Sequence, residues 1–372
     1  MTRLSIILPT FNEAGSIVDL IGRITAFSVD FIPSEEGGAQ LEILVVDDDS
    51  TDGTAELVRQ LSLQTPLVRL VRRVGRRGLA SAIREGLLDA TGELAVVMDS
   101  DGQHEVASVI SAVQLLRADR LDLVVGSRFH PEACIQGLSA QRERGSTWAN
   151  RWARFSVSRR YGHLTDLMSG FFVVRVVTCE VLIRAVDVNG FKFLYELLAL
   201  SKGRLRCAEV PLRFQPREHG MSKLDVAIFW DFLISLIHHL VFRLLPRRAI
   251  SFALVGVSGV LVQLVVTRLL LRGSIFSFEQ VLPVAVLAAA TSNYLINNAL
   301  TFRFQRQRGA ALVRGLLRFW LVASLPVLAN VGVASAYFKF VQSDIVVAQL
   351  AGILVVFIWN YAASSRFVWN TP

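Results

Sequence analysis

Acidic residues gather in two short segments of the chain, Asp47-Asp48-Asp49 and Asp99-Ser100-Asp101, and each segment follows an apolar run. A third polar segment, Pro9-Thr10-Phe11-Asn12-Glu13, follows the first apolar run of the chain. Two carboxylates at the end of a buried strand can hold a hard divalent cation, and such a cation can neutralise a diphosphate as it leaves. These segments therefore indicate metal-assisted chemistry on a substrate that carries phosphate.

The glycine-rich loops that bind phosphates through backbone amides are missing from the sequence. It contains no GxxxxGK[ST] motif, and no GxGxxG motif follows the first apolar run. A diphosphate would therefore be held by the metal and by basic side chains. The available basic residues are Arg72, Arg76, Arg77, Arg128, Arg217 and Lys223.

The apolar runs that precede the polar segments are short and rich in β-branched residues, which is typical of buried strands. Helical patterns lie between them, so we predict an α/β fold with a mostly parallel sheet covered on both faces. Ligands bind beyond the carboxyl ends of such strands, so we expect the three polar segments to form one rim. The expected strands are Leu4–Leu8, Leu41–Val46, Leu67–Val71, Leu94–Met98, Leu121–Val125 and Ala208–Phe214, and the expected helices are Glu13–Phe27, Thr54–Leu63, Leu79–Asp89 and Glu105–Arg117.

The last third of the chain has a different composition. Charged residues make up 19% of the whole chain, below the ~25% that is usual for soluble domains. After residue 248 come four stretches without a charged residue, each close to the ~20 residues that cross a bilayer. They predict an all-α transmembrane domain of four helices, with spans at about 249–271, 281–301, 317–338 and 345–365.

The net charge of +8 belongs almost entirely to this apolar third, where nine Lys and Arg face two Asp and Glu from Ala249 onwards. A nucleic-acid-binding surface would spread its basic residues over a polar domain, so we expect no nucleic-acid partner. The basic residues gather before the first span and between the second and third. The positive-inside rule then predicts a multi-pass integral membrane protein with the first domain and both termini in the cytoplasm.

Two further patterns concern the organisation of the chain. Apolar residues recur at helical spacing in Leu224–Leu245 with charged residues between them, which indicates an amphipathic interfacial helix, or else an ordinary surface helix. We therefore expect a catalytic domain at 1–223, this helix or linker at 224–248 and the transmembrane domain at 249–372. In addition, Asn293-Tyr294 matches Asn360-Tyr361 at a shift of 67 residues, which indicates two similar hairpins unless the match is chance.

Taken together, the motifs resemble those of the polyprenyl-phosphate glycosyltransferases, the dolichyl-phosphate mannosyltransferase-like group of the inverting GT-A class. The last 120 or so residues resemble the GtrA-like four-span unit that some members carry. The segments that carry the first resemblance are PTFNE at Pro9–Glu13, VVDDDSTDGT at Val45–Thr54, DSDGQH at Asp99–His104, GSR at Gly126–Arg128, DLMSGFFVVR at Asp166–Arg175 and EVPLRFQPREHGMSK at Glu209–Lys223.

This resemblance implies a GT-A, Rossmann-like catalytic domain and a specific reaction. A hexose, with mannose as the best guess, would pass from GDP-mannose or a UDP-sugar to polyprenyl or dolichyl phosphate with inversion. The implied cofactor is Mg²⁺ or Mn²⁺. The implied partners are the nucleotide sugar, the polyprenyl phosphate and the lipid bilayer, and a homo-oligomer is left open.

The resemblance also implies roles for individual residues. Asp101, Asp166 and Arg128 would be catalytic, and Asp99, Asp101 and Gln103 would hold the metal. The family often has Arg after Gly170-Phe171, where this chain has Phe172, so Arg175 is the expected substitute. The nucleotide sugar would contact Pro9, Phe11, Glu13, Val45, Asp47, Asp48, Asp99, Ser100, Asp101, Gln103, Arg128, Arg217 and Lys223, and the acceptor phosphate would contact Arg128, Ser169, Arg175, Ser222 and Lys223.

Two other functions stay open. The GtrA-like unit would suit a flippase or transporter of lipid-linked sugars with an attached transferase, although few charges in the spans argue against an ion pathway. A processive polysaccharide synthase would carry a QxxRW signature. Gln141–Arg144 matches it in part, but Gly145 replaces the Trp.

Overall fold

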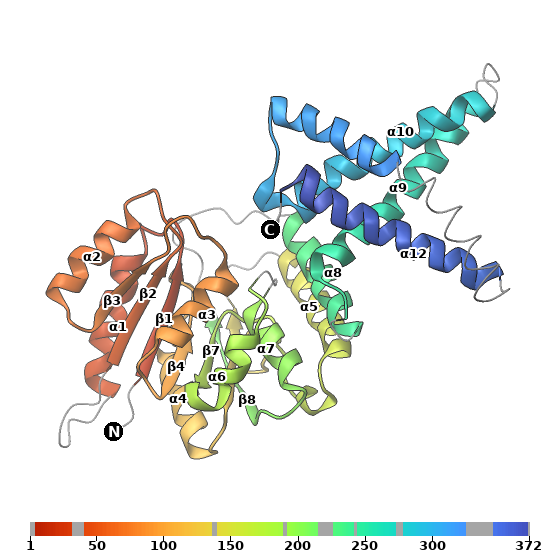
Figure 1. The fold of residues 1–372 in the computed structure, drawn as a ribbon. Helices are drawn as coiled ribbons and strands as arrows, with labels where there is room; N and C mark the ends of the chain where they lie inside the picture. The colour runs from red at the N-terminus through yellow and green to blue at the C-terminus, as the bar shows by residue number, and fades with distance from the viewer. Residues whose placement is uncertain are drawn as a thin grey trace. The chain divides into compact units, whose positions relative to one another are not determined.

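The computed structural model describes residues 4–31, 41–135, 140–188, 192–214, 226–241, 244–272, 278–324 and 345–370. The chain divides into two compact units, Met1–His239 and Leu240–Pro372, whose helices and strands are drawn in Figure 1. The domain boundaries expected from the sequence stay predictions, and each unit is described by itself.

The first unit is built on one large sheet. Its strands are β1 (Leu4–Thr10), β2 (Leu41–Asp47), β3 (Val68–Arg72), β4 (Leu94–Val97), β5 (Leu123–Ser127), β7 (Phe172–Arg175) and β8 (Cys207–Pro211). They lie in the order β3-β2-β1-β4-β7-β5-β8. All neighbouring pairs are parallel except those of β7, which is antiparallel to both β4 and β5. The predicted α/β fold with a mostly parallel sheet is confirmed, and β7 is an addition to it.

Helices cover both faces of this sheet (Figure 1). One face packs against α1 (Ile17–Phe31), α2 (Thr54–Gln64) and α4 (Ala107–Ala118). The other packs against α3 (Leu79–Asp89), α5 (Ala140–Ser156), α6 (Val176–Ala185) and α7 (Phe193–Ser201). Successive strand residues point to opposite faces, so Ile6 and Leu8 join the first core and Ile7 the second. Both cores need apolar residues, which is why the strands read as continuous apolar runs.

Replacing two helical glycines of this unit by alanine is expected to have opposite effects on its stability. A Cβ at Gly86 in α3 would lie 2.4 Å from Cγ2 of Ile7 and 3.0 Å from Cγ2 of Val46, whereas a Cβ at Gly22 in α1 would meet nothing within 4 Å. We expect Gly86→Ala to destabilise the unit by about 1–3 kcal/mol through overpacking. Gly22→Ala should stabilise it by roughly 0.5–1 kcal/mol, because alanine restricts the unfolded chain. Unfolding midpoints of the two variants check this, and similar midpoints would show that α3 moves away from the sheet without cost.

The predicted strand Ala208–Phe214 differs from the structure. It is interrupted at Leu212, and its second part, β9 (Arg213–Phe214), pairs with β6 (Cys134–Ile135) in a separate two-stranded sheet. The predicted helix at Leu224–Leu245 is α8 (Val226–Leu240). Its Phe232 is 3% exposed and packs in the core shared by α5 and α7.

The second unit is helical in the part that the structure describes. It contains α9 (Arg247–Arg272), α10 (Phe278–Ile296), a helix over residues 310–324 and α12 (Ile345–Ala363). Within the described ranges, α9 alone is both long and apolar enough to cross a membrane. Residues 325–344 lie outside those ranges, so the number of four spans stays a prediction.

A local geometry occurs twice in the second unit. A π-helical turn spans Asn297–Thr301 after α10, and another spans Ser364–Val368 after α12, at the shift of 67 residues seen in the sequence. The residues that follow these turns, Phe302 and Trp369, stack on each other with ring centroids 4.2 Å apart. The two repeated positions therefore meet in the buried core of the unit.

Two aromatic contacts are also related by the shift of 67 residues. Phe252 contacts Tyr361, and Phe319 contacts Tyr294, with 5.7 Å between ring centroids in both cases. The shift of 67 residues converts Phe252 into Phe319 and Tyr294 into Tyr361. Equivalent positions thus make equivalent contacts, which supports two similar hairpins.

Candidate active site

The polar segments after β1, β2 and β4 lie at one edge of the sheet. Thr10 at the end of β1 is paired with Asp47 at the end of β2, and the Asp48 amide donates to the Thr10 carbonyl at 2.9 Å. The Ser100 hydroxyl, from the segment after β4, donates to the Pro9 carbonyl at 3.0 Å. The structure therefore brings the three segments together at one rim.

The first acidic segment uses its carboxylates to shape its own loop. Asp47 is fully buried and accepts hydrogen bonds from the amide and the hydroxyl of Ser50, at 3.0 and 2.5 Å. Asp48 is 6% exposed, accepts from the Gly78 amide at 2.6 Å and forms an ion pair with Arg73. Both carboxylates thus hold the loops that surround a ligand.

Phe11 is the large apolar side chain that the rim exposes, at 44%. The Arg77 guanidinium lies 4.6 Å from the centre of its ring. Next to it, the Glu13 carboxylate accepts from the Ser16 hydroxyl at 3.0 Å. A half-exposed ring with a cation on one face suits a planar, electron-rich group such as a nucleobase.

The segment Asp99–Gln103 supplies the carboxylates that suit a metal. The Asp99 side chain is 35% exposed, and its backbone amide donates to Nδ1 of His104 at 3.2 Å. Asp101 accepts the Gln103 amide at 3.1 Å. Gly170 faces Asp99 so closely that a Cβ there would lie 2.5 Å from Oδ2. A side chain at position 170 would therefore displace the Asp99 carboxylate.

These residues fit a divalent cation that shares its ligands with a substrate. Among the described residues, no group of three or more His, Cys, Asp or Glu forms a complete metal site. Mg²⁺ commonly binds through one or two carboxylates, with substrate phosphates and water completing its shell. The carboxylates of Asp99 and Asp101 and the side-chain carbonyl oxygen of Gln103 are a set of that kind.

A two-pronged ion pair joins Arg128, after β5, to Asp166. Nε of Arg128 lies 2.7 Å from Oδ2 of Asp166, and Nη2 lies 3.0 Å from Oδ1. Asp166 is fully buried, whereas the Arg128 side chain is 20% exposed. The Asp166 amide donates to the Glu209 carboxylate at 2.9 Å, which holds the backbone there.

This pair fixes a permanent cation on the rim. Burial alone would lower the pKa of Arg128, but the negative charge of Asp166 raises it above its ordinary value. Both Asp166 oxygens accept hydrogen bonds from Arg128, and the catalytic role expected for Asp166 from the sequence stays a prediction. The geometry shows that Asp166 fixes the orientation of the Arg128 guanidinium.

Lys192, directly before α7, is a second basic residue of the site, and the sequence analysis missed it. Burial lowers its pKa, while Asp99, Asp166 and Asp101 raise it and Arg128 lowers it further. Lys192 is therefore within electrostatic range of both the acidic pair and the Arg128 ion pair. No local pattern singles it out, because a lysine between two Phe also occurs at Lys339.

Three predicted residues have other roles in the structure. Val45 packs in the core beside α1. The Ser169 hydroxyl donates to the Gly126 carbonyl at 2.6 Å and so fixes the approach to β7. Arg175 is paired with Leu94 at the amino end of β4, opposite the rim, where it forms an ion pair with Glu93. The antiparallel direction of β7 is the reason for this placement. Arg217, Ser222 and Lys223 lie outside the described residues.

An aromatic surface lies on α5 and α8 of the first unit. Trp148, Trp152, Phe155 and Phe229 are 46%, 43%, 71% and 52% exposed. Their rings form a continuous row, in which Trp148 stacks on Phe229 and contacts Trp152, which contacts Phe155, at 5.8–5.9 Å between centroids. Exposed aromatic patches of this kind are typical of membrane interfaces and partner-binding surfaces.

Comparison with known proteins agrees with the two units. Residues 5–182 match the profile of glycosyl transferase family 2, and residues 251–369 match that of the GtrA/DPMS transmembrane domain. Over 371 residues the chain is 30% identical to a dolichol-phosphate mannosyltransferase of Pyrococcus furiosus, covering 99% of this chain and 100% of that relative. It is 32% identical over 257 residues to a dolichol-phosphate mannosyltransferase of Saccharomyces cerevisiae, covering 67% and 91% of the two chains.

One solved structure with a similar fold is glucosyl-3-phosphoglycerate synthase from Mycobacterium tuberculosis. It is 21% identical, covers 64% of this chain and 80% of its own, and superposes with a TM-score of 0.46.

The sheet, its acidic rim and the second unit define a glycosyltransferase that is also a membrane protein. The chain belongs to the dolichol-phosphate mannosyltransferase family, within glycosyl transferase family 2. This confirms the family resemblance found in the sequence.

Proposed function

We propose that this chain transfers one mannose from a nucleotide diphosphate sugar to a polyprenyl phosphate in the membrane. The observation that carries the proposal is that a group of acidic residues and a group of basic residues lie at one rim. Asp99 and Asp101 form the acidic side, and the Arg128–Asp166 pair with Lys192 forms the basic side. One side suits a metal-bound diphosphate, and the other suits the phosphate of an acceptor.

In this proposal Asp99, Asp101 and Gln103 would hold Mg²⁺ or Mn²⁺, which neutralises the leaving diphosphate when it is bound. The exposed ring of Phe11 stacks on the base, with Arg77 beside it. Pro9, Glu13, Asp47, Asp48 and Ser100 shape the surrounding pocket. GDP and UDP donors both fit this description.

Arg128 binds the acceptor phosphate through the guanidinium N–H groups that Asp166 does not engage, and Lys192 is a second donor for it. A lipid monophosphate is already anionic at neutral pH, so its oxygen attacks without a strong base. The engagement of both Asp166 oxygens by Arg128 is consistent with that. Direct displacement at the anomeric carbon inverts its configuration.

The acceptor determines where the reaction takes place. Withdrawing an isoprenoid from the bilayer costs ~0.8 kcal/mol for each exposed CH₂, so the enzyme must reach the lipid. The aromatic surface of α5 and α8 suits contact with the bilayer interface. We propose four spans in the second unit and a cytoplasmic location for the first unit and both termini, because the basic residues lie between the second and third spans and before the first.

The experiment is transfer by purified full-length protein from GDP-mannose and a panel of UDP-sugars to polyprenyl phosphate, with the sugars on each lipid counted. We expect one sugar for each lipid. Several sugars would indicate a processive synthase instead. No transfer, together with movement of a lipid-linked sugar across proteoliposomes, would indicate a transporter.

Gly170→Ala should weaken metal-dependent nucleotide binding roughly tenfold or more, as loss of the support around metal ligands usually does. The reason is that the added Cβ would occupy the place of the Asp99 carboxylate. Gly145→Ala is the matched control, because a Cβ there meets nothing within 4 Å. Nucleotide titrations with Mn²⁺ and with a chelator measure the effect. If Gly170→Ala retained full metal-dependent nucleotide binding, Asp99 would not be a metal ligand.

A further inference from the structure

The second unit contains a pocket that the proposed transfer does not use. Its volume is about 450 Å³, within the ~300–1,000 Å³ usual for small-molecule sites. It lies between the end of α10 and the helix over residues 310–324. Its lining residues are Leu295, Asn298, Arg306, Gln307, Arg308, Gly309 and Leu312.

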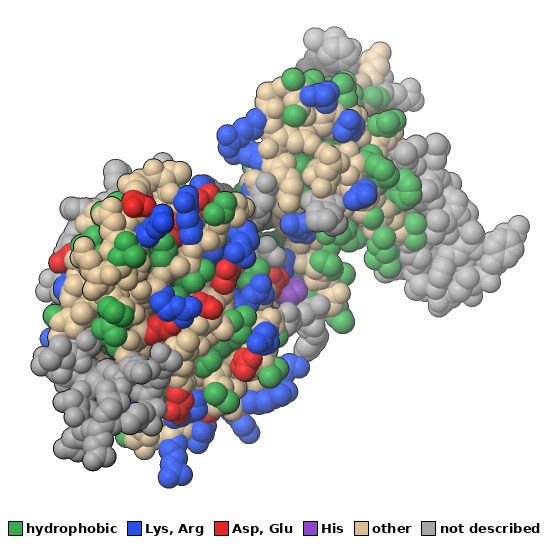
Figure 2. Space-filling model, turned by 60° about the vertical axis from the view of Figure 1, so that its left-hand side comes forward, with side chains coloured by type: hydrophobic (Ala, Val, Ile, Leu, Met, Phe, Trp, Pro, Cys, Tyr) green, Lys and Arg blue, Asp and Glu red, His purple; other side chains and the backbone are tan. Residues whose placement is uncertain are grey.

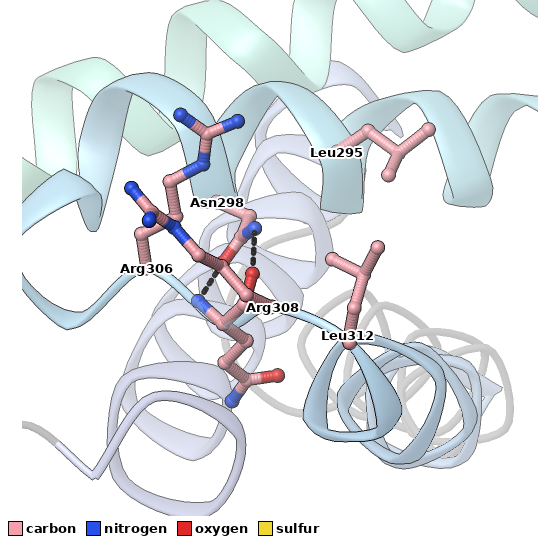
Figure 3. A pocket seen from close by; sticks show the side chains of 7 residues that line it. Leu295, Asn298, Arg306, Arg308 and Leu312 are labelled. Atoms are coloured by element: carbon pink, nitrogen blue, oxygen red, sulfur yellow. Dashed lines mark hydrogen bonds between the residues drawn. The ribbon is translucent and has the colours of Figure 1, made fainter.

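The pocket has a basic end and an apolar end. Figure 3 shows Arg306 and Arg308 together on one side, with Leu295 and Leu312 on the other. Leu295 is 47% exposed. A ligand that fills the pocket would therefore carry an anionic group at one end and an aliphatic chain at the other.

The backbone that presents the two arginines is fixed. The Asn298 side chain accepts from the Gln307 amide at 2.9 Å and donates to the Gln307 carbonyl at 3.1 Å (Figure 3). The Gln307 side chain turns inward, where it accepts from the Tyr294 hydroxyl at 2.8 Å and donates to the Val368 carbonyl. Successive side chains of an extended segment point to opposite sides. Since the Gln307 side chain points to the interior, those of Arg306 and Arg308 lie together on the opposite side, where they line the pocket (Figure 3).

The charge of the two arginines is not balanced within the second unit. In the described part of the chain, neither guanidinium forms a hydrogen bond or an ion pair. No Asp or Glu occurs anywhere between Glu279 and Asp344. Figure 2 shows Lys and Arg side chains among apolar ones on the visible face of this unit. Two adjacent guanidinium groups without an acidic partner suit a phosphate, because each guanidinium can bind two of its oxygens.

We propose that this pocket of the second unit binds a phosphate group carried on an aliphatic lipid, through residues other than those of the catalytic rim. The ligand is either the polyprenyl phosphate itself or a phospholipid with an anionic headgroup. Arg306 and Arg308 hold the phosphate, Leu295 and Leu312 contact the first part of the chain, and Asn298 keeps the arginines in place. The inference concerns lipid binding alone and does not depend on the transfer reaction.

The test compares two double variants of the full-length protein in detergent. Arg306→Gln/Arg308→Gln removes the two pocket arginines. Arg314→Gln/Arg318→Gln removes the same charge from exposed positions on the following helix, outside the pocket. Native mass spectrometry counts the lipids retained, and titrations with polyprenyl phosphate, phosphatidylglycerol and inorganic phosphate give the affinities.

We expect the pocket variant to retain one lipid phosphate fewer than the wild type and to bind the preferred lipid at least tenfold more weakly, with the control unchanged. Preference for polyprenyl phosphate would identify the ligand of the pocket as the substrate lipid. Preference for phosphatidylglycerol would identify it as a membrane phospholipid. Leu295→Ser should weaken lipid binding but not the binding of inorganic phosphate. Equal loss in both double variants would show a diffuse charge effect and overturn the site. Equal affinity for lipids and inorganic phosphate would overturn the role of the chain.

Discussion

Asp101→Asn is expected to lower the rate of sugar transfer by about a hundredfold or more, beyond the 10–100-fold loss that follows removal of a supporting residue around a metal. Asn keeps the shape of the side chain and an oxygen that accepts the Gln103 amide, so the loop should persist. It removes the charge that attracts the cation, and the leaving diphosphate then departs without neutralisation.

The matched control is Asp119→Asn, an exposed residue after α4 with no place at the rim. Turnover is measured with Mg²⁺ and Mn²⁺ over a range of concentrations, and unfolding midpoints confirm the fold. Excess metal should restore part of the activity, because a weakened site fills at higher concentration. Wild-type turnover in Asp101→Asn would contradict the assignment of the metal to this segment.

Arg128→Lys is expected to raise the KM for polyprenyl phosphate by about tenfold or more, because lysine keeps the charge but loses the two-pronged geometry. Asp166→Asn should act in the same direction, since the guanidinium is then no longer fixed. Arg128→Met is a poorer test, because an unpaired buried Asp166 would cost roughly 3–5 kcal/mol of stability. Nucleotide affinity should change little in the first two variants.

The double variant Arg128→Lys/Asp166→Asn separates positioning from direct contact. If Asp166 acts through Arg128, the double variant should be scarcely worse than Arg128→Lys alone, because residues in direct contact are not additive. Steady-state kinetics with the acceptor varied measures this. Fully additive losses would mean that Asp166 meets a substrate on its own.

The rim was predictable because its signals are local. Each acidic or polar segment directly follows a buried strand, and the edge at which parallel strands end is fixed by the topology. The predicted helix Leu79–Asp89 has the bounds of α3, and the other predicted helices that flank the rim overlap α1, α2 and α4.

The features that the sequence did not reveal depend on contacts between distant residues. Phe172–Arg175 has the same apolar character as the parallel strands, and nothing in it indicates the antiparallel direction that moves Arg175 away from the rim. The burial of Asp166 depends on Arg128, which lies 38 residues earlier. Lys192 reaches the site because α7 packs on the sheet, which the sequence pattern did not predict.

The second unit shows the same division. The apolar stretches and the repeat at 67 residues are visible in the sequence, and the paired π-helical turns occur at that repeat. The pocket beside Arg306 and Arg308 depends on the hydrogen bonds between Asn298 and Gln307, so only the folded chain reveals it.

The most direct test of the account is the anomeric configuration of the product made by the full-length protein. The reaction contains GDP-mannose, in which the sugar is α-linked, together with polyprenyl phosphate and Mg²⁺, and NMR of the purified lipid identifies the linkage. The account predicts a single β-linked mannose on the lipid phosphate, and no product when a chelator removes the metal. An α-linked product, or transfer that continues undiminished in the chelator, would contradict it.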